Sequence, residues 1–330
     1  MKLFFVLAAL AMAVSVVNGY SDDDAWKDYK KKHKLDYNIA GDDGRRDGLR
    51  KKIFLAQRER INKHNSESNN YLQALSEFSV MTAWEKKQFL GIDSSRVPSA
   101  EFLKSIPVFN SQNRKLPPNL DYRDDTCMPE VKNQGGCGSC WAFAAMTPLE
   151  FSQCKANGKL VDLSEQQLVS CDSVSSGCNG GWYVSAYNYL QNSGGSANET
   201  LYPYTAQTGV CQFQTSTVET KVSTYGYIQS QNATAMQAAL QQYGPIAVAL
   251  NVVDSFYGYG SGVYDDKACD GVYMINHAVV IVGWGKLKGV DYWIVRNSWG
   301  PGWGANGYIL IERGVNKCLI ELYPAYVKAA

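Results

Sequence analysis

Residues 133–143 read NQGGCGSCWAF, a glycine-rich turn that runs directly into an apolar stretch. The turn holds two cysteines three positions apart, Cys137 and Cys140. Such a pair is compatible with a redox couple, with half of a metal site, or with one structural sulfur beside one reactive sulfur. The rest of the chain has to decide among these three chemistries.

The amino terminus predicts secretion. Met1 and Lys2 are followed by the apolar run LFFVLAALAMAVSVV and by small residues that end at Gly19. This pattern is typical of a secretory signal peptide, residues 1–19, with cleavage near Gly19. A spanning helix needs about 20 apolar residues, and charged sequence follows too soon for one. We therefore expect an oxidising compartment.

In that compartment the nine cysteines become informative, because most of them should form disulfides. All nine lie after residue 126. An odd number leaves at least one thiol free.

The chain changes character near Leu116. Residues 20–115, called the front segment here, are charged and contain no cysteine. Residues 91–120 lose periodicity and contain four prolines, which predicts an extended linker. The front segment also contains residues that recur at helical spacing on one face: Leu49, Ile53, Phe54, Gln57, Ile61 and Asn65. A shorter pattern around Trp26, Tyr29 and Tyr37 predicts a preceding helix.

Charge is divided unevenly between the two parts. The front segment has a net positive charge and residues 116–330 a net negative one. This asymmetry is compatible with mutual attraction or with ordinary solvated helix faces. Neither part is basic enough to indicate nucleic-acid binding.

Residues 116–330 divide again into a helical half and a β-rich half. WAFAAMTPLEFSQC (141–154) predicts a helix that starts directly after Cys140, and LSEQQLVSC (163–171) opens with a Ser-x-x-Gln capping box. After residue 244 the pattern becomes strand-like in PIAVALNV, HAVVIVGWG, DYWIVRNS and GYILIE. The expected fold is α+β, with two subdomains and a cleft between them.

Cys140 is the better candidate for a nucleophile. A helix amino terminus favours the thiolate, and Cys140 stands where the turn becomes a helix. A thiolate also needs a base. His277 is the one histidine after residue 115, because His33 and His64 lie in the front segment. A lone histidine beside a strand more often has a structural role than a catalytic one. Here His277 is the one histidine in a domain with an unpaired cysteine, and this favours the catalytic role.

Asn297, in RNSWGPGW, is the candidate that would orient His277, and Trp299 could shield their hydrogen bond from water. The plain alternative for NSWG is a turn with structural tryptophans. Gln134 and the backbone N–H of Cys140 would suit a developing oxyanion.

These motifs resemble the papain-like cysteine peptidases, the cathepsin L group in particular. QGGCGSCW (134–141), the isolated His277 and NSWGPGW (297–303) stand in the family's order. The resemblance implies Cys140 as nucleophile, His277 as general acid and base, Asn297 as its orienter and Gln134 as oxyanion donor. It implies the papain-like fold, with a helical subdomain and a β-barrel-like subdomain over residues 116–330.

The resemblance also implies a disulfide pattern in which Cys137 is structural. Three family pairs, together with a fourth that we predict by comparison with cathepsin B, use eight of the nine cysteines: Cys137–Cys178, Cys171–Cys211, Cys269–Cys318 and Cys127–Cys154.

The front segment resembles the inhibitory propeptide of this family, so we expect a zymogen. Arg46 and Gln57 depart from the family's helix motif. In ALSEFSV (74–80) Phe78 is kept, but Val80 replaces an acidic residue that is implicated in pH-dependent release. Processing is expected between about residues 105 and 117, because PNLDYR (118–123) matches the family's mature start.

Specificity follows from the same comparison. Trp299 lies in the substrate-binding set, and the pocket for the second residue before the scissile bond (P2) should be uncharged. The expected lining is Trp182, Tyr183, Ala249, Ile275 and Ala278. This lining predicts an apolar or aromatic residue at P2. If Glu321 pointed into the pocket, arginine would also be accepted. An endopeptidase is expected, because no insertion that would block the cleft is found.

The expected partners are protein and peptide substrates, the chain's own propeptide and cystatin-like inhibitors. We expect a monomer with no cofactor, no metal, and no nucleic-acid or membrane partner. Asn198 and Asn232 begin glycosylation sequons. The place of action is expected to be a lysosome or the outside of the cell, as for a digestive enzyme.

Three alternatives remain open. A thiol–disulfide oxidoreductase would use Cys137 and Cys140 together and would need neither His277 nor Asn297. A zinc site would need a second paired cluster of ligands. A catalytically silent binding protein on the same fold would normally lack one of the catalytic residues.

Overall fold

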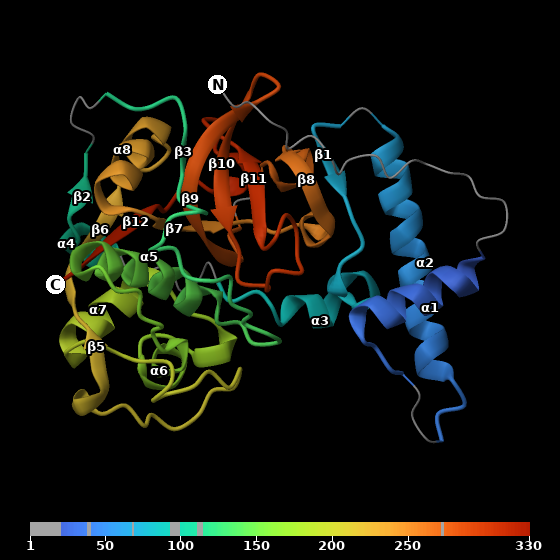
Figure 1. Ribbon diagram of the computed structural model, residues 1–330, viewed down its shortest axis with the longest axis horizontal. Helices are drawn as coiled ribbons and strands as arrows, with labels where there is room; N and C mark the ends of the chain where they lie inside the picture. Colours follow the sequence, from blue (N-terminus) through green and yellow to red (C-terminus); the bar gives the residue numbers. More distant parts are fainter. Residues whose placement is uncertain (1–20, 38–40, 68, 93–99, 111–114, 272–273) are drawn as a thin grey trace, which may run out of the picture. The chain divides into compact units, whose positions relative to one another are not determined.

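The computed structural model describes residues 21–37, 41–67, 69–92, 100–110, 115–271 and 274–330 (Figure 1). The predicted signal peptide lies outside these ranges. The chain forms two compact units, of which the first ends at Ala56 and the second begins at Gln57.

The first unit is built on helix α1 (Asp22–His33) and the beginning of α2 (Arg45–Ser66). Ser21 caps α1, with acidic residues in its first turn and basic residues in its last, as the helix dipole favours. The ring of Phe54 lies 5.4 Å from that of Trp26 and 4.8 Å from that of Tyr29. The helix predicted around Trp26 and Tyr29 is therefore present, and an aromatic cluster joins it to α2.

The predicted face of α2 is only partly buried. Gln57 and Ile61 are buried, whereas Leu49, on the same predicted face, is 54% exposed. Asn65 is also exposed, yet its side chain exchanges two 2.8 Å hydrogen bonds with the backbone of strand β1 (Tyr71–Gln73). Helical spacing alone could not reveal which end of the face meets a partner.

The extended linker predicted for residues 91–120 was wrong in its described parts. They contain helix α4 (Ala100–Ser105) and strands β2 (Val108–Phe109) and β3 (Leu120–Asp121). Both strands exist through distant partners, β6 (Val222–Ile228) for β2 and β9 (His277–Leu287) for β3. Pairing over such distances leaves no local pattern in a short segment.

The predicted helical half is present. Helix α5 (Cys140–Asn157) is buried nearly all round, as expected for a central helix. Figure 1 shows it beside α6 (Glu165–Cys171) and α7 (Tyr183–Ser193). The second unit also contains α3 (Ala83–Lys87) and α8 (Ala233–Tyr243).

The four predicted strands are present in the β-rich half as β7 (Ile246–Leu250), β9, β10 (Val290–Arg296) and β11 (Tyr308–Glu312). Among the described residues they belong to a ten-stranded sheet with the order β1-β8-β11-β10-β9-β7-β12-β6-β2, and β3 pairs with β9 off this path. The remaining strands are β8 (Tyr259–Tyr264), β12 (Ala325–Ala329) and the short pair β4 (Ser196–Ala197) and β5 (Val218–Thr220). The fold is α+β, as predicted.

The capping box predicted for α6 forms only by half. The Ser164 hydroxyl accepts from the Gln167 N–H at 3.1 Å. The Gln167 side chain, however, binds the backbone of Gly195 and Ala197 instead of reaching back to Ser164. The Ser164 N–H donates to the Ala197 carbonyl, so the start of α6 is bound to the segment that follows α7.

A largely buried ammonium group joins the helical half to the turn that leads to Cys140. Lys132 Nζ lies 2.8 Å from carboxylate oxygens of Glu150 on α5 and of Glu165 on α6, and 2.6 Å from Asp162. Burial raises the pKa of Glu165 and nearby Glu150 adds to this rise, whereas the Lys132 ammonium opposes it and favours the carboxylate. Both glutamates are almost fully buried, so each depends on Lys132 for compensation.

We predict that Lys132→Met destabilises the fold by about 3–5 kcal/mol, because it leaves two buried carboxyl groups without their cation. Chemical denaturation at neutral pH, in a Cys140→Ala background that prevents self-digestion, measures this loss. The matched control is Lys155→Met, which removes a half-exposed pair with Asp125 and should cost less than about 1 kcal/mol. Equal effects of the two substitutions would contradict the assignment.

Candidate active site

Cys140 is the first residue of α5 and is completely buried. Among the described cysteines it is the free one. The other eight form Cys127–Cys154, Cys137–Cys178, Cys171–Cys211 and Cys269–Cys318, the four pairs expected above. Within NQGGCGSCWAF, therefore, Cys137 is bonded to a distant loop and only Cys140 carries a thiol.

His277 and Asn297 come together from neighbouring strands. His277 begins β9, and Asn297 directly follows β10. Nε2 of His277 lies 2.8 Å from Oδ1 of Asn297, and the Trp299 ring covers the pair with its centroid 4.8 Å from that of the imidazole. Nδ1 of His277 is buried without a hydrogen-bond partner among the described residues. This nitrogen is available for proton transfer.

The backbone brings the sulfur beside the histidine. The N–H of Ala278, next to His277 in β9, donates to Cys140 Sγ at 3.4 Å. Helix α5 packs directly against β9. The thiol and the imidazole thus come from the helical half and the β-rich half, respectively.

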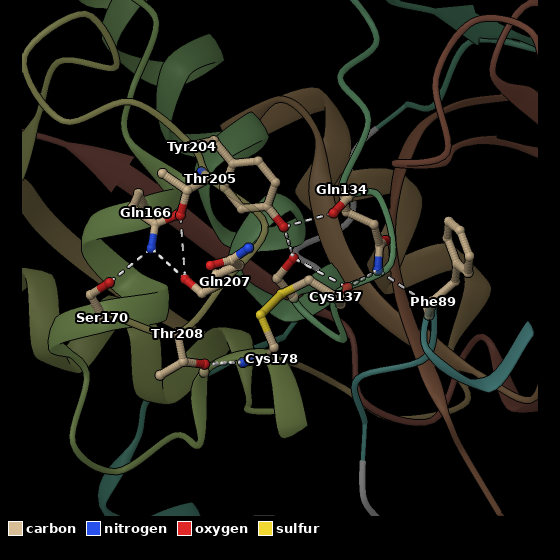
Figure 2. The surroundings of a disulfide bond; sticks show 12 residues. Phe89, Gln134, Cys137, Gln166, Ser170, Cys178, Tyr204, Thr205, Gln207 and Thr208 are labelled. Atoms are coloured by element: carbon tan, nitrogen blue, oxygen red, sulfur yellow. Dashed lines mark hydrogen bonds between the residues drawn. A yellow bond between two sulfur atoms is a disulfide. The ribbon is translucent and has the colours of Figure 1, made fainter. Parts of the chain in front are cut away.

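Gln134 is held in one orientation. Its Oε1 accepts from the Ser298 hydroxyl at 2.6 Å, and its backbone N–H donates to the Ser298 carbonyl at 2.8 Å. Its Nε2 therefore points the other way and donates to the carbonyls of Cys137, at 2.8 Å, and Phe89, at 3.0 Å. Figure 2 shows these two contacts beside the Cys137–Cys178 disulfide. Sequence reasoning had not singled out Ser298.

The front segment occupies this region. The Gly181 N–H donates to the Gly91 carbonyl at 3.0 Å, and the Ile92 N–H donates to the Asn276 carbonyl at 3.1 Å. A Cβ at position 91 would lie 1.9 Å from the Gly138 carbonyl oxygen, so only glycine permits this approach. Residues 89–92 therefore take up hydrogen-bonding groups that lie around Cys140.

A second set of contacts fixes the preceding part of the front segment. Strand β1 pairs antiparallel with β8. Asp254 lies 2.5 Å from Arg60 and 2.7 Å from Lys86. The Phe78 ring is buried, with its centroid 4.7 Å from that of Trp299 and 5.1 Å from that of Tyr257. The retained Phe78 thus contacts the tryptophan that covers His277.

Burial keeps both reacting groups neutral in this form. It raises the pKa of the Cys140 thiol to about 12, and several backbone N–H groups oppose the rise. It lowers the pKa of His277 to about 4, against the opposing effect of Asn297. A thiolate–imidazolium pair is therefore disfavoured while the site is covered.

The expected P2-pocket residues share one core cluster, which contains Trp182, Tyr183, Ala249, Ile275 and Ala278. Two residues that sequence reasoning missed, Tyr227 and Tyr323, fix its aromatic wall. Trp182 Nε1 donates to the Tyr227 hydroxyl at 2.7 Å, and the Tyr183 hydroxyl donates to the Tyr323 carbonyl.

Glu321 is engaged elsewhere. Its carboxylate accepts from Trp293 Nε1 at 2.9 Å and from the Gly314 N–H at 2.8 Å. Trp293 belongs to the other core cluster of the second unit. Glu321 therefore supplies no charge to the expected P2 pocket.

The two sequons differ in their local bonding. Oδ1 of Asn198 accepts from both the hydroxyl and the N–H of Thr200, at 2.7 and 2.9 Å. Asn232 caps α8 by accepting from the Ala235 N–H at 2.9 Å, and its Nδ2 donates to Gln229.

Within the described ranges, no cluster of three or more His, Cys, Asp or Glu side chains has the geometry to hold a metal ion. No helix in the same ranges combines the length and apolarity needed to cross a bilayer.

Comparison with known families places both parts of the chain. Residues 116–328 match the papain family cysteine protease domain, and residues 26–85 match the cathepsin propeptide inhibitor domain. A cathepsin L-like proteinase of Fasciola hepatica is 35% identical over 94% of this chain and 93% of its own length. Cathepsin K of Mus musculus is 35% identical over 89% of each chain.

Solved structures of related proteins support the same family assignment. The digestive procathepsin L2 proteinase from the larval midgut of Tenebrio molitor superposes with a TM-score of 0.86, at 32% identity, over 93% of this chain and 100% of that one. A second digestive procathepsin from the same source, procathepsin L 3, superposes with a TM-score of 0.82. The chain therefore belongs to the papain family of cysteine proteases, and it carries a cathepsin-type propeptide inhibitor domain in front of the protease domain.

Proposed function

We propose that this chain is the secreted zymogen of an endopeptidase in which Cys140 attacks the peptide carbonyl and His277 transfers the protons. The observation that carries the proposal is the junction of three separate elements. The free thiol at the start of α5 lies against β9, where His277 is hydrogen-bonded to Asn297 at 2.8 Å. A redox couple is not favoured, because Cys137 is bonded to Cys178.

The reaction proceeds in two stages once the front segment has left. The Cys140 thiolate forms a bond to the carbonyl carbon, and the negative charge on oxygen is stabilised by the backbone N–H of Cys140 and by Gln134 Nε2. The C–N bond then breaks as His277 protonates the leaving amine. Water, losing a proton to the same imidazole, adds to the acyl group, and the C–S bond breaks to release the acid and restore the thiolate.

The Phe89 carbonyl supports the assignment of Gln134. It receives a hydrogen bond from Gln134 Nε2, as a developing oxyanion would. The front segment thus occupies a donor that catalysis needs. Removal of the segment would free the donor and readmit water around Cys140 and His277.

The specificity proposal is an apolar or aromatic side chain at P2. It is supported by the uncharged wall of Trp182, Tyr183, Ala249, Ile275 and Ala278. Acceptance of arginine through Glu321 is not proposed, because that carboxylate is bonded to Trp293 and Gly314.

The remaining assignments concern processing, location, glycosylation and inhibition. We propose a signal peptide over residues 1–19, a propeptide over 20–115 and a mature, monomeric protease over 116–330. Action in a lysosome or outside the cell, glycans on Asn198 and Asn232, and inhibition by cystatin-like proteins belong to the same proposal. The four disulfides fit an oxidising compartment.

The decisive experiment is active-site labelling with a thiol-reactive epoxide. In the processed protein we expect one adduct, on Cys140, and loss of cleavage of an apolar-aromatic dipeptide reporter in proportion to labelling. In the intact precursor labelling should be slow, because the thiol is buried and its pKa is raised to about 12. Labelling of both Cys137 and Cys140 only after reduction, without any cleavage, would overturn the proposal.

For the oxyanion donor, we predict that Gln134→Ala lowers kcat of the processed enzyme about 10²–10³-fold. Exposed Gln241 provides the matched control, and Gln241→Ala should retain full activity. Reporter kinetics with active sites counted by epoxide titration measure the effect. A loss confined to KM would contradict the assigned role.

For the front segment, we predict that Phe78→Ala speeds epoxide labelling of the intact precursor on the order of 10²–10³-fold, because truncating a buried phenylalanine costs about 3–5 kcal/mol. Trp84 is a matched control from the same segment, since its side chain is 70% exposed. Trp84→Ala should label like the unmodified precursor. Equal acceleration of labelling by both substitutions would contradict a specific role of Phe78 in docking.

The pH dependence of docking follows from three carboxyl groups. Burial raises the pKa of Glu77 above its usual value of 4.5. The stabilisation of docking by protonated Glu77 is therefore complete below that pH and weakens as the pH rises.

At Asp254 and Asp266 burial raises the pKa, but hydrogen bonds outweigh it and hold both pKa values below 3.8. The bond that comes from the front segment is donated by Lys86 to Asp254 and by Tyr71 to Asp266. Ser255 also donates to Asp266, from within the protease domain. The contributions of both carboxylates are therefore lost only as pH falls below about 3.8.

We accordingly predict that acidification from about pH 7 to pH 5 does not release the front segment, which carries the uncharged Val80 where the family resemblance implies an acidic residue. Release should begin below about pH 4, when Asp254 and Asp266 become protonated. Hydrogen exchange of residues 71–80 in the Cys140→Ala precursor, corrected for the intrinsic exchange rate, measures this. Loss of protection at pH 5 would refute the prediction.

A further inference from the structure

The end of the front segment forms a strand on the protease sheet. Strand β2 pairs parallel with β6, with Val108 opposite Tyr227 and Phe109 opposite Ile228. The Tyr227 N–H donates to the Pro107 carbonyl at 2.9 Å, and the Gln229 N–H donates to the Phe109 carbonyl at 3.2 Å. Among the described strands β2 is the last in the order of the sheet, so it covers the outer edge of β6.

One side chain anchors this strand. The Phe109 ring lies edge-on to two tyrosines, with centroids 5.5 Å from Tyr243 and 6.3 Å from Tyr326. These tyrosines stack on each other at 4.1 Å. The neighbouring Val108 is 52% exposed, as expected for alternation along a strand. The contact therefore requires an extended backbone and one aromatic side chain.

At Gly226 the sheet lets the incoming strand approach β6 closely. A Cβ on Gly226 would lie 2.5 Å from the Pro107 carbonyl oxygen and 2.8 Å from the Tyr326 ring. A larger residue at 226 would push both Pro107 of the incoming strand and the Tyr326 ring outward. Glycine here serves the docking of Pro107 as well as the packing of Tyr326.

This edge is distinct from the catalytic centre. Residues 89–92 contact Gln134 and Gly181. The contacts given above for residues 107–109 are instead with the edge of β6 and with Tyr243 and Tyr326. Processing after residue 115, as proposed above, followed by departure of the front segment, deprives the N–H groups of Tyr227 and Gln229 of their acceptors. An exposed edge of this kind pairs readily with another extended chain.

We infer that the β6 edge of the processed enzyme, together with Tyr243 and Tyr326, is an exosite for protein substrates. Its occupant is an extended stretch of an unfolded protein substrate that places an aromatic side chain between the β6 edge and the two tyrosines. The inference rests on the proposed endopeptidase function. It adds a substrate-binding surface outside the P2 pocket, one that small dipeptide reporters cannot reach.

The test uses the hexapeptide SIPVFN, residues 105–110, with processed enzyme. We expect saturable binding by calorimetry, unchanged hydrolysis of the dipeptide reporter, and competitive slowing of casein hydrolysis. The same peptide with Phe109→Ala should bind about tenfold more weakly or worse, because it lacks the aromatic anchor.

An enzyme variant provides the complementary arm. Tyr243 is only partly buried at the end of α8, and its exposed neighbour Gln242 supplies the matched control. Tyr243→Ala should raise KM for casein severalfold and weaken peptide binding, while kcat/KM for the reporter and the melting temperature stay unchanged. Gln242→Ala should leave all four quantities unchanged.

Three results would overturn the exosite. They are absence of peptide binding at millimolar concentration, inhibition of the reporter over the same range as binding, and a processed enzyme that still holds residues 107–109 by mass spectrometry. Failure of the proposed function would look different, because the reporter would not be hydrolysed at all while peptide binding could still be measured.

Discussion

The geometry of the site depends on the ion pairs that the Lys132 ammonium group forms with two buried glutamates. The ammonium group neutralises Glu150 on the helix that begins with Cys140, and Glu165 on the neighbouring helix. The backbone that follows runs beside residues 298–300: the Gly300 N–H donates to the Lys132 carbonyl, and the Gln134 N–H donates to the Ser298 carbonyl. One largely buried cation therefore links Gln134, the helix that begins with Cys140 and the turn after Asn297. Because the paired carboxyl groups lie deep in the protein, this arrangement cannot shift without exposing an uncompensated charge.

Inhibition by the front segment uses the same physics as catalysis. Its Phe89 carbonyl takes the hydrogen bond of Gln134, and its burial of the site stabilises the neutral thiol and imidazole. The segment does not need to distort the catalytic residues, because removing water is sufficient to disfavour the ion pair. Its anchors at Phe78 and along β1 lie outside these reacting groups, so docking and catalytic silencing are separable.

Prediction from sequence succeeded where a local pattern carries a chemical requirement. The odd cysteine, the single histidine after residue 115 and the Gly-rich turn before α5 were each visible without a structure. It failed where a segment depends on a distant partner. Strand β2 exists through β6, and Gln167 binds the turn after α7 in place of completing a capping box. In each case a long-range contact outweighed the local preference.

The sequence by itself determined the family, the α+β class and the set of residues available for chemistry, because thiol, imidazole and amide groups at those positions are covalent facts. Only the tertiary structure decided what each of them touches. It turned Glu321 toward Trp293 and away from the expected P2 pocket, brought Ser298 to Gln134, and laid the chain's own Phe109 on the edge of β6. Such outcomes depend on where a side chain finds its hydrogen-bond partner and on which strand edge is left open, and both are properties of the packed molecule.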